Sequence, residues 1–149
     1  MDYRDLFRSV KRHPGMFVHN GTYDETSAFV HGCDAGNDYC LLDGFREWLV
    51  VKLGGYNEFA WSALILYIAF PGHPNPQEAC RESPENNRVA IDKLFDLLDE
   101  FFEVKGPRHE GLVTIFLQYR EWREIQDSFN SAREGPRRMR SSVRKKLKA

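Results

Sequence analysis

The sequence predicts an all-α protein, a compact single-domain bundle of about six helices with a basic C-terminal tail. Apolar residues recur three and four positions apart in several segments, which is the spacing of an amphipathic helix. Capping residues and helix-ending Gly or Pro bound the clearest of these segments. A length of 149 residues is typical of one domain, and 42% hydrophobic residues argue against disorder in its body. The helices are predicted at 3–12, 22–31, 42–53, 58–70, 84–104 and 110–129.

The first three helices are predicted from their ends. Pro14 biases the residue before it away from the helical region, so the first helix ends near residue 12. Met16 to Val18 is then expected as a short extended run. Thr22 is expected to cap the second helix in a capping box with Glu25. Residues 32–37 are expected to form a loop, and the Gly54-Gly55 pair ends the third helix.

The fourth helix contains the longest apolar run, Phe59 to Phe70, interrupted only by Ser62. At twelve residues this run is well short of the roughly 18 that suggest a membrane span. We therefore predict the most buried helix of a soluble domain, capped by Asn57. Three prolines follow within 71–76, so residues 71–82 are expected to form a mobile loop because proline cannot continue a helix.

The fifth helix is the clearest and the sixth the least clear. Ser83 is a good N-cap, Pro84 suits the first helical position, and Gly106 ends the helix. Its apolar stripe consists of Ile91, Leu94, Phe95, Leu98, Phe101 and Phe102. Segment 110–129 also fits a strand by propensity, but its 3–4 spacing continues through Trp122, which favours a helix.

Charge divides the chain into two unequal parts. Residues 133–149 contain eight Lys or Arg and one Glu, a net charge of +7. Residues 1–132 contain 13 basic and 21 acidic residues, a net charge of −8. We therefore predict an acidic helical domain over 1–132 and a flexible basic tail over 133–149, separated by Gly135-Pro136.

The polar side of helix 84–104 gathers carboxylates that share one face because they lie three or four residues apart. These candidate partner-binding residues are Asp92, Asp96, Asp99, Glu100 and Glu103. An acidic face attracts a basic protein partner, although such a face is more often simply solvated. A Mg²⁺ site would need further oxygen ligands, which the sequence does not identify, so no metal is predicted.

No reaction is predicted from the sequence. The three cysteines lack a CxxC pair, which indicates a reduced, cytoplasmic protein, and the N-terminus lacks the apolar region of a signal peptide. The five histidines are scattered, and phosphate-binding glycine motifs are absent. A hydrolase that uses Cys33 with His31 or His73 is a weaker alternative. We predict a protein that is no enzyme, carries no cofactor and contacts no membrane.

Several short motifs between about residues 12 and 103 are similar to a set of small bacterial proteins. They are Pro14-Gly15-Met16-Phe17, Phe29-Val30-His31-Gly32, Gly44 to Leu49, Ala60-Trp61 and Leu94 to Phe101. Several members of that set resemble immunity proteins of polymorphic or contact-dependent toxin systems. Here Phe17 stands where a Tyr is usual, and Cys33 stands where a Tyr follows the glycine. The resemblance implies a binding role.

Two functions are therefore expected. The leading one is a cytoplasmic immunity or antitoxin-like protein that neutralises its partner, expected to be a basic toxin domain, by occlusion. The alternative is an accessory protein that binds nucleic acid through its tail, where basic side chains contact phosphates. The residues of that alternative are Arg137, Arg138, Arg140, Arg144, Lys145, Lys146 and Lys148.

Overall fold

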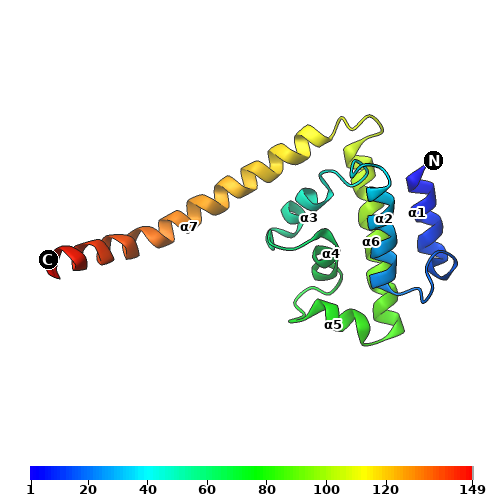
Figure 1. The fold of residues 1–149 in the computed structure, drawn as a ribbon, viewed down its shortest axis with the longest axis horizontal. Helices are drawn as coiled ribbons and strands as arrows, with labels where there is room; N and C mark the ends of the chain where they lie inside the picture. The colour runs from blue at the N-terminus through cyan, green and yellow to red at the C-terminus, as the bar shows by residue number, and fades with distance from the viewer. Residues whose placement is uncertain (149) are drawn as a thin grey trace.

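The computed structural model describes the backbone of residues 1–148 and the side chains of residues 1–134. Over these residues the fold is all-α, as predicted, with seven α-helices and one short 3₁₀ turn (Figure 1). The elements are α1 Tyr3–Arg12, η1 Pro14–Met16, α2 Tyr23–Ala35, α3 Phe45–Leu53, α4 Trp61–Ala69, α5 Pro76–Arg81, α6 Pro84–Lys105 and α7 Leu112–Lys148. No helix among the described residues is both long and apolar enough to cross a membrane.

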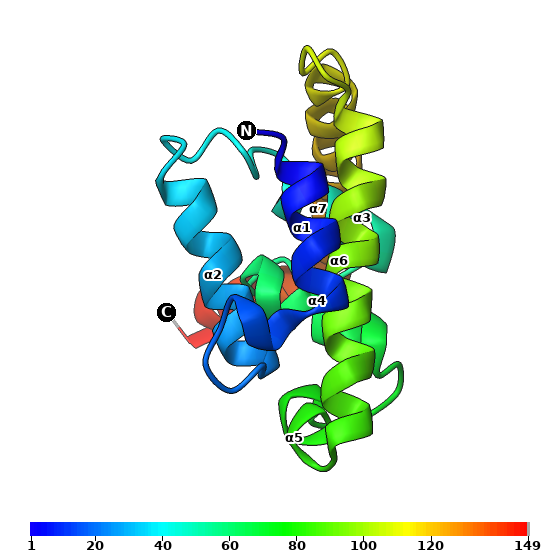
Figure 2. The ribbon, with the colours of Figure 1, turned by 90° about the vertical axis from the view of Figure 1, so that its right-hand side faces the viewer.

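Helix α6 is the centre of the fold. It begins as predicted, since the Ser83 hydroxyl accepts from the Asn86 N–H and Pro84 occupies the first turn. Its apolar stripe is covered because α1, α2, α4 and α5 all pack against it (Figure 2). Leu94 and Leu98 in the middle of the stripe are fully buried. The hydrophobic core therefore lies along α6, as its 3–4 pattern predicted.

Helix α2 is longer than predicted. It continues through Gly32 to Ala35, so residues 32–35 belong to the helix and not to a loop. Thr22 caps the Glu25 N–H, but the Glu25 carboxylate accepts from the Asn20 N–H at 2.8 Å instead of closing a capping box. The extension brings Asp34 into the core, where its Oδ1 accepts from the Leu42 N–H at 2.9 Å.

Three other local predictions are wrong. The expected extended run after Pro14 begins with the 3₁₀ turn η1, and α3 begins at Phe45 instead of Leu42. Helix α4 begins at Trp61, so Asn57 does not cap it. The Asn57 side-chain oxygen instead accepts from Tyr119 at 2.7 Å and from Arg46 at 3.3 Å. The Asn57 oxygen is thus used in tertiary hydrogen bonds and not in a helix cap.

The segment predicted as a mobile loop, 71–82, contains helix α5. Asn75 accepts from the Glu78 N–H as its cap, and Pro76 occupies the first turn. Ala79 and Cys80 are buried where α5 packs on α4 and α6. Proline therefore starts a helix here as well as preventing the preceding one from continuing.

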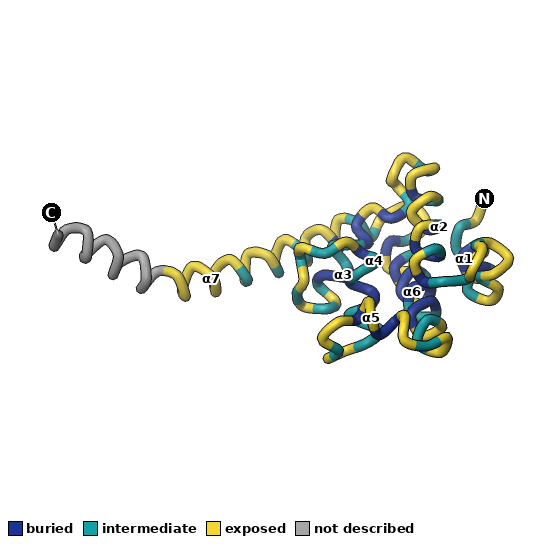
Figure 3. Tube along the Cα trace, turned by 60° about the horizontal axis from the view of Figure 1, so that its bottom comes forward, coloured by how far each residue is buried: buried dark blue, intermediate teal, exposed yellow. Residues whose placement is uncertain are grey.

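Helix α7 resolves the helix-or-strand alternative for 110–129 in favour of helix. Its first turns pack against α3, where Ile115 is buried. Gly44 allows the approach to α3, and Gly111 allows the chain to pass close to the end of α6. A Cβ at Gly44 would lie 3.0 Å from Leu112, and a Cβ at Gly111 would collide with the Val104 carbonyl. Beyond these turns α7 extends away from the body, and its described side chains are largely exposed (Figure 3).

Candidate protein interface

The five predicted partner-binding carboxylates lie on α6, and each has a basic partner within the chain. Arg4 and Arg8 on α1 both contact Asp99, at 3.1 and 3.0 Å, and Arg4 also contacts Glu103 at 2.9 Å. The remaining pairs are Lys11–Asp96 at 2.6 Å, Lys52–Glu100 at 2.8 Å and Arg88–Asp92 at 2.8 Å. Basic side chains from α1, α3 and α6 itself therefore line this face.

Asp99 is the centre of this ionic network. Its hydrogen bond from Arg4 is the main cause that lowers the pKa of the carboxyl, and the charge of Arg8 acts in the same direction. The same bond, with a second to Glu103, raises the pKa of the Arg4 guanidinium. Phe7 and Val10, also on α1, are buried in the core beside the network. Helix α1 is therefore held against α6 both by ion pairs and by apolar packing.

The acidic face is therefore not the open surface that the sequence suggested. Five carboxylates meet five basic side chains, so the face has little net charge of its own. Sequence reasoning placed the carboxylates on one face correctly, but it missed Arg4, Arg8 and Lys11. These recur at a 3–4 spacing on α1, and that spacing was the available signal. A role of the face in partner binding stays a prediction.

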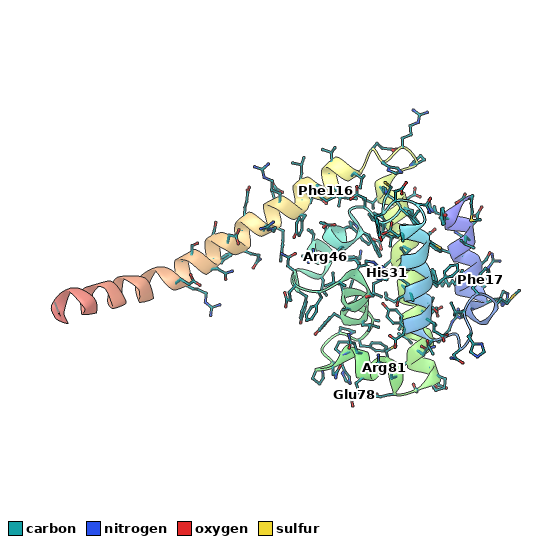
Figure 4. The ribbon with its side chains drawn as sticks, viewed as in Figure 1. Phe17, His31, Arg46, Glu78, Arg81 and Phe116 are labelled. Carbon is teal, nitrogen blue, oxygen red and sulfur yellow. The ribbon has the colours of Figure 1, made fainter. Side chains whose placement is uncertain are left out.

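Helix α7 carries two apolar surfaces that the sequence analysis did not single out as sites. The first, the outward patch, consists of Val113, Phe116 and Leu117, which are 68%, 39% and 55% exposed. Figure 4 shows Phe116 on the stretch of α7 next to the body. The second, the distal seam, consists of Trp122, Ile125, Phe129 and Ala132. Ile125 is 54% exposed and Phe129 is 65% exposed.

The outward patch is held on a fixed support. Tyr119 anchors α7 to the loop before α4 through its hydrogen bond to Asn57, and Arg46 of α3 donates to the same oxygen. Arg46 also donates to the Phe59 carbonyl at 2.9 Å. Side chains of α7 that precede Tyr119 are therefore presented in a defined orientation, which lowers the entropic cost of binding to them.

The cysteines and histidines do not form the Cys–His pair that a hydrolase would need. The His31 ring packs against Trp61, with 4.4 Å between the ring centroids. The His73 Nδ1 accepts from the Asn75 N–H at 3.0 Å. Burial raises the pKa of Cys33, so its thiolate is disfavoured. None of these contacts activates a nucleophile, and no group of three metal-ligating side chains gathers among the described residues.

A cavity of about 540 Å³ lies between α2, α5 and the start of α6. Tyr23, Cys80 and Asn87 line it, and the Arg81–Asp24 ion pair, at 3.0 Å, lies beside it. Burial raises the pKa of the Cys80 thiol to about 11. The Asn87 side chain is already used, since it accepts from the Tyr23 N–H and donates to the Gly21 carbonyl.

The residues of the nucleic-acid alternative, Arg137 to Lys148, lie outside the residues whose side chains the structure describes. The predicted boundary at Gly135-Pro136 lies there too, and both stay predictions. Comparison of the chain with protein-family models, with curated proteins and with solved structures finds no match. The functional argument therefore rests on the surfaces described above.

Proposed function

We propose that this protein is an immunity or antitoxin-like binding protein that neutralises a basic toxin domain by occlusion, as the sequence resemblance implies. The outward patch of α7 is the contact surface, and its three exposed apolar side chains are the observation that carries the proposal. Exposed apolar clusters on a fixed support are typical of protein contact sites. This moves the expected contact from the paired carboxylates of α6 to α7.

The net charge of the domain supports a basic partner. Pairing of the α6 carboxylates leaves the net charge of −8 over residues 1–132 unchanged. A charge of that size accelerates association with a basic protein over long range, while the apolar patch supplies short-range affinity. The two features thus act at different stages of binding.

The test starts from capture of the partner with the tagged full-length protein, followed by an assay of the captured protein's own toxic activity. We expect one equivalent of the protein to abolish that activity. The double variant Val113→Lys/Leu117→Lys should weaken neutralisation by about tenfold or more, because it places two charges in the apolar contact. A matched control, Thr114→Lys/Gln118→Lys, adds the same charge to other exposed positions of the same turns and should neutralise normally.

Equal neutralisation by both double variants would remove the outward patch from the proposal. Recovery of nucleic acid alone, released by salt or by nuclease, would instead favour the accessory role of the tail. Charge reversal at Asp96 and Glu103 tests the original surface. Loss of neutralisation by that variant, with an unchanged melting temperature, would return the contact to α6.

A further inference from the structure

Most of the distal seam of α7 is exposed among the residues whose side chains are described. Trp122, Ile125, Phe129 and Ala132 follow each other at spacings of three, four and three residues, which places them on one side of the helix. Trp122 packs against the edge of the core, whereas Ile125 and Phe129 lie outside it and are mostly exposed. The spacing of the seam is that of the contact positions in a two-helix coiled coil.

Packing of the distal seam against a partner helix would stabilise the part of α7 that extends from the body. Most helical stability in proteins comes from packing of an amphipathic face, and among the residues with described side chains the packed positions of α7 lie between 112 and 126. The seam begins near the end of these packed positions. The next position of this repeat is Pro136, and Met139 and Val143 follow it in the same seven-residue register. The pattern therefore continues well past the body.

Charge complementarity identifies the occupant of the seam. Residues 1–132 carry a net charge of −8, whereas the last residues of the chain, 133–149, carry a net charge of +7. Two parallel copies would place two segments of charge +7 side by side. Two antiparallel copies would place each basic end near the body of the other copy, whose residues 1–132 carry a net charge of −8.

We propose that the distal seam pairs with the same seam of a second copy of this chain, with the two α7 helices antiparallel. The pairing is isologous, so Ile125 and Phe129 of each copy are covered by the other. The inference concerns the purified chain alone. It does not depend on the toxin-binding proposal, which uses a different side of α7.

The first test is the molar mass of the full-length protein, measured by analytical ultracentrifugation over a range of concentrations. We expect a dimer that the double variant Ile125→Lys/Phe129→Lys weakens by about tenfold or more, because charges then face each other in the seam. The matched control is Val113→Lys/Leu117→Lys, which alters the outward patch and should leave the dimer intact. An unchanged melting temperature of the body in the variant Ile125→Lys/Phe129→Lys shows that folding is not what is measured.

The second test is orientation. A mixture of ¹⁴N-labelled and ¹⁵N-labelled protein treated with a lysine cross-linker reports which lysines of different copies lie close together. We expect mixed-isotope links between Lys145 or Lys148 and body lysines such as Lys52 and Lys93. Dimerisation should weaken as salt is raised and in a chain that ends at Ala132, because both changes reduce the attraction between the unlike ends.

Three results would overturn the inference. They are a monomer at every concentration, a dimer that the seam variant leaves unchanged, and mixed-isotope links confined to tail lysines, which would show a parallel pair. Because no toxin is present in these measurements, failure of the dimer leaves the proposed function standing. Failure of neutralisation with an intact dimer contradicts the proposed function alone.

Discussion

Helices α6 and α7 have similar patterns but different environments. Both are long and amphipathic, with apolar residues at 3–4 spacing. In α6 the stripe is covered by several other helices, including α3, whose Phe45 ring centroid lies 5.0 Å from that of Phe101, and Leu94, Leu98 and Phe101 are fully buried. In the described part of α7 the covered residues lie near the start of the helix, and Ile125 and Phe129 are exposed. The same pattern thus forms a core in one helix and a surface available for binding in the other.

The largest expected difference is between truncations of the two stripes. Leu98→Ala in α6 should lower the free energy of unfolding by about 2–5 kcal/mol, because it leaves a cavity in the core. Ile125→Ala in α7 should change it by about 0.5 kcal/mol or less in the monomer, since the side chain is 54% exposed. Urea unfolding at low protein concentration measures both. A large decrease in the free energy of unfolding for Ile125→Ala would mean that the seam is covered within the monomer.

The C-terminal end of α6 contains a buried charged residue, Lys105. Lys105 is 3% exposed, and its ammonium donates to the Cys40 carbonyl at 2.7 Å and to the Leu41 carbonyl at 3.0 Å. Lys105→Met should cost about 1–3 kcal/mol, because two carbonyls lose their donor. Equal stability of the two proteins at pH 7 would show that water replaces the ammonium without loss.

The same lysine predicts a pH dependence. Desolvation lowers the pKa of Lys105 below its ordinary value of 10.5. Between the lowered pKa and 10.5 the unfolded chain binds more protons than the folded one, so stability rises with pH. We therefore expect the free energy of unfolding of the wild type to increase relative to that of Lys105→Met as pH approaches 10.5. A difference between the two proteins that is constant with pH would contradict the lowered pKa.

A small effect is also expected on the ionic side of α6. Asp99→Asn should cost about 1 kcal/mol or less at pH 7, because Asp99 and its arginine partners are partly exposed. The lowered pKa of Asp99 means that its contribution is present above the ordinary value of 3.8 and is lost as pH falls through the folded-state pKa. The wild type and the variant should therefore converge in acid and at high salt. A stability difference that persists under both conditions would mean that the substitution acts through the packing of α1 and not through ion pairing.

Local signals determined much of this protein from the sequence alone. Ser83, Pro84 and the apolar stripe established α6, and His13-Pro14 and Gly54 ended α1 and α3 where the structure ends them. The sequence also placed the carboxylates of α6 on one face. These predictions succeeded because each depends on residues within one or two turns of each other, where backbone sterics and capping decide the outcome.

Only the tertiary structure decided how those faces are used. Asn57 was a plausible cap until Arg46 and Tyr119 used its oxygen, and Asp99 was an open carboxylate until Arg4 and Arg8 reached it from 91 or more positions away. Likewise, the 3–4 spacing of α7 predicted an apolar face without showing where α3 stops covering it. Partners distant in sequence are brought together by packing of the whole chain, and a local pattern contains no record of them.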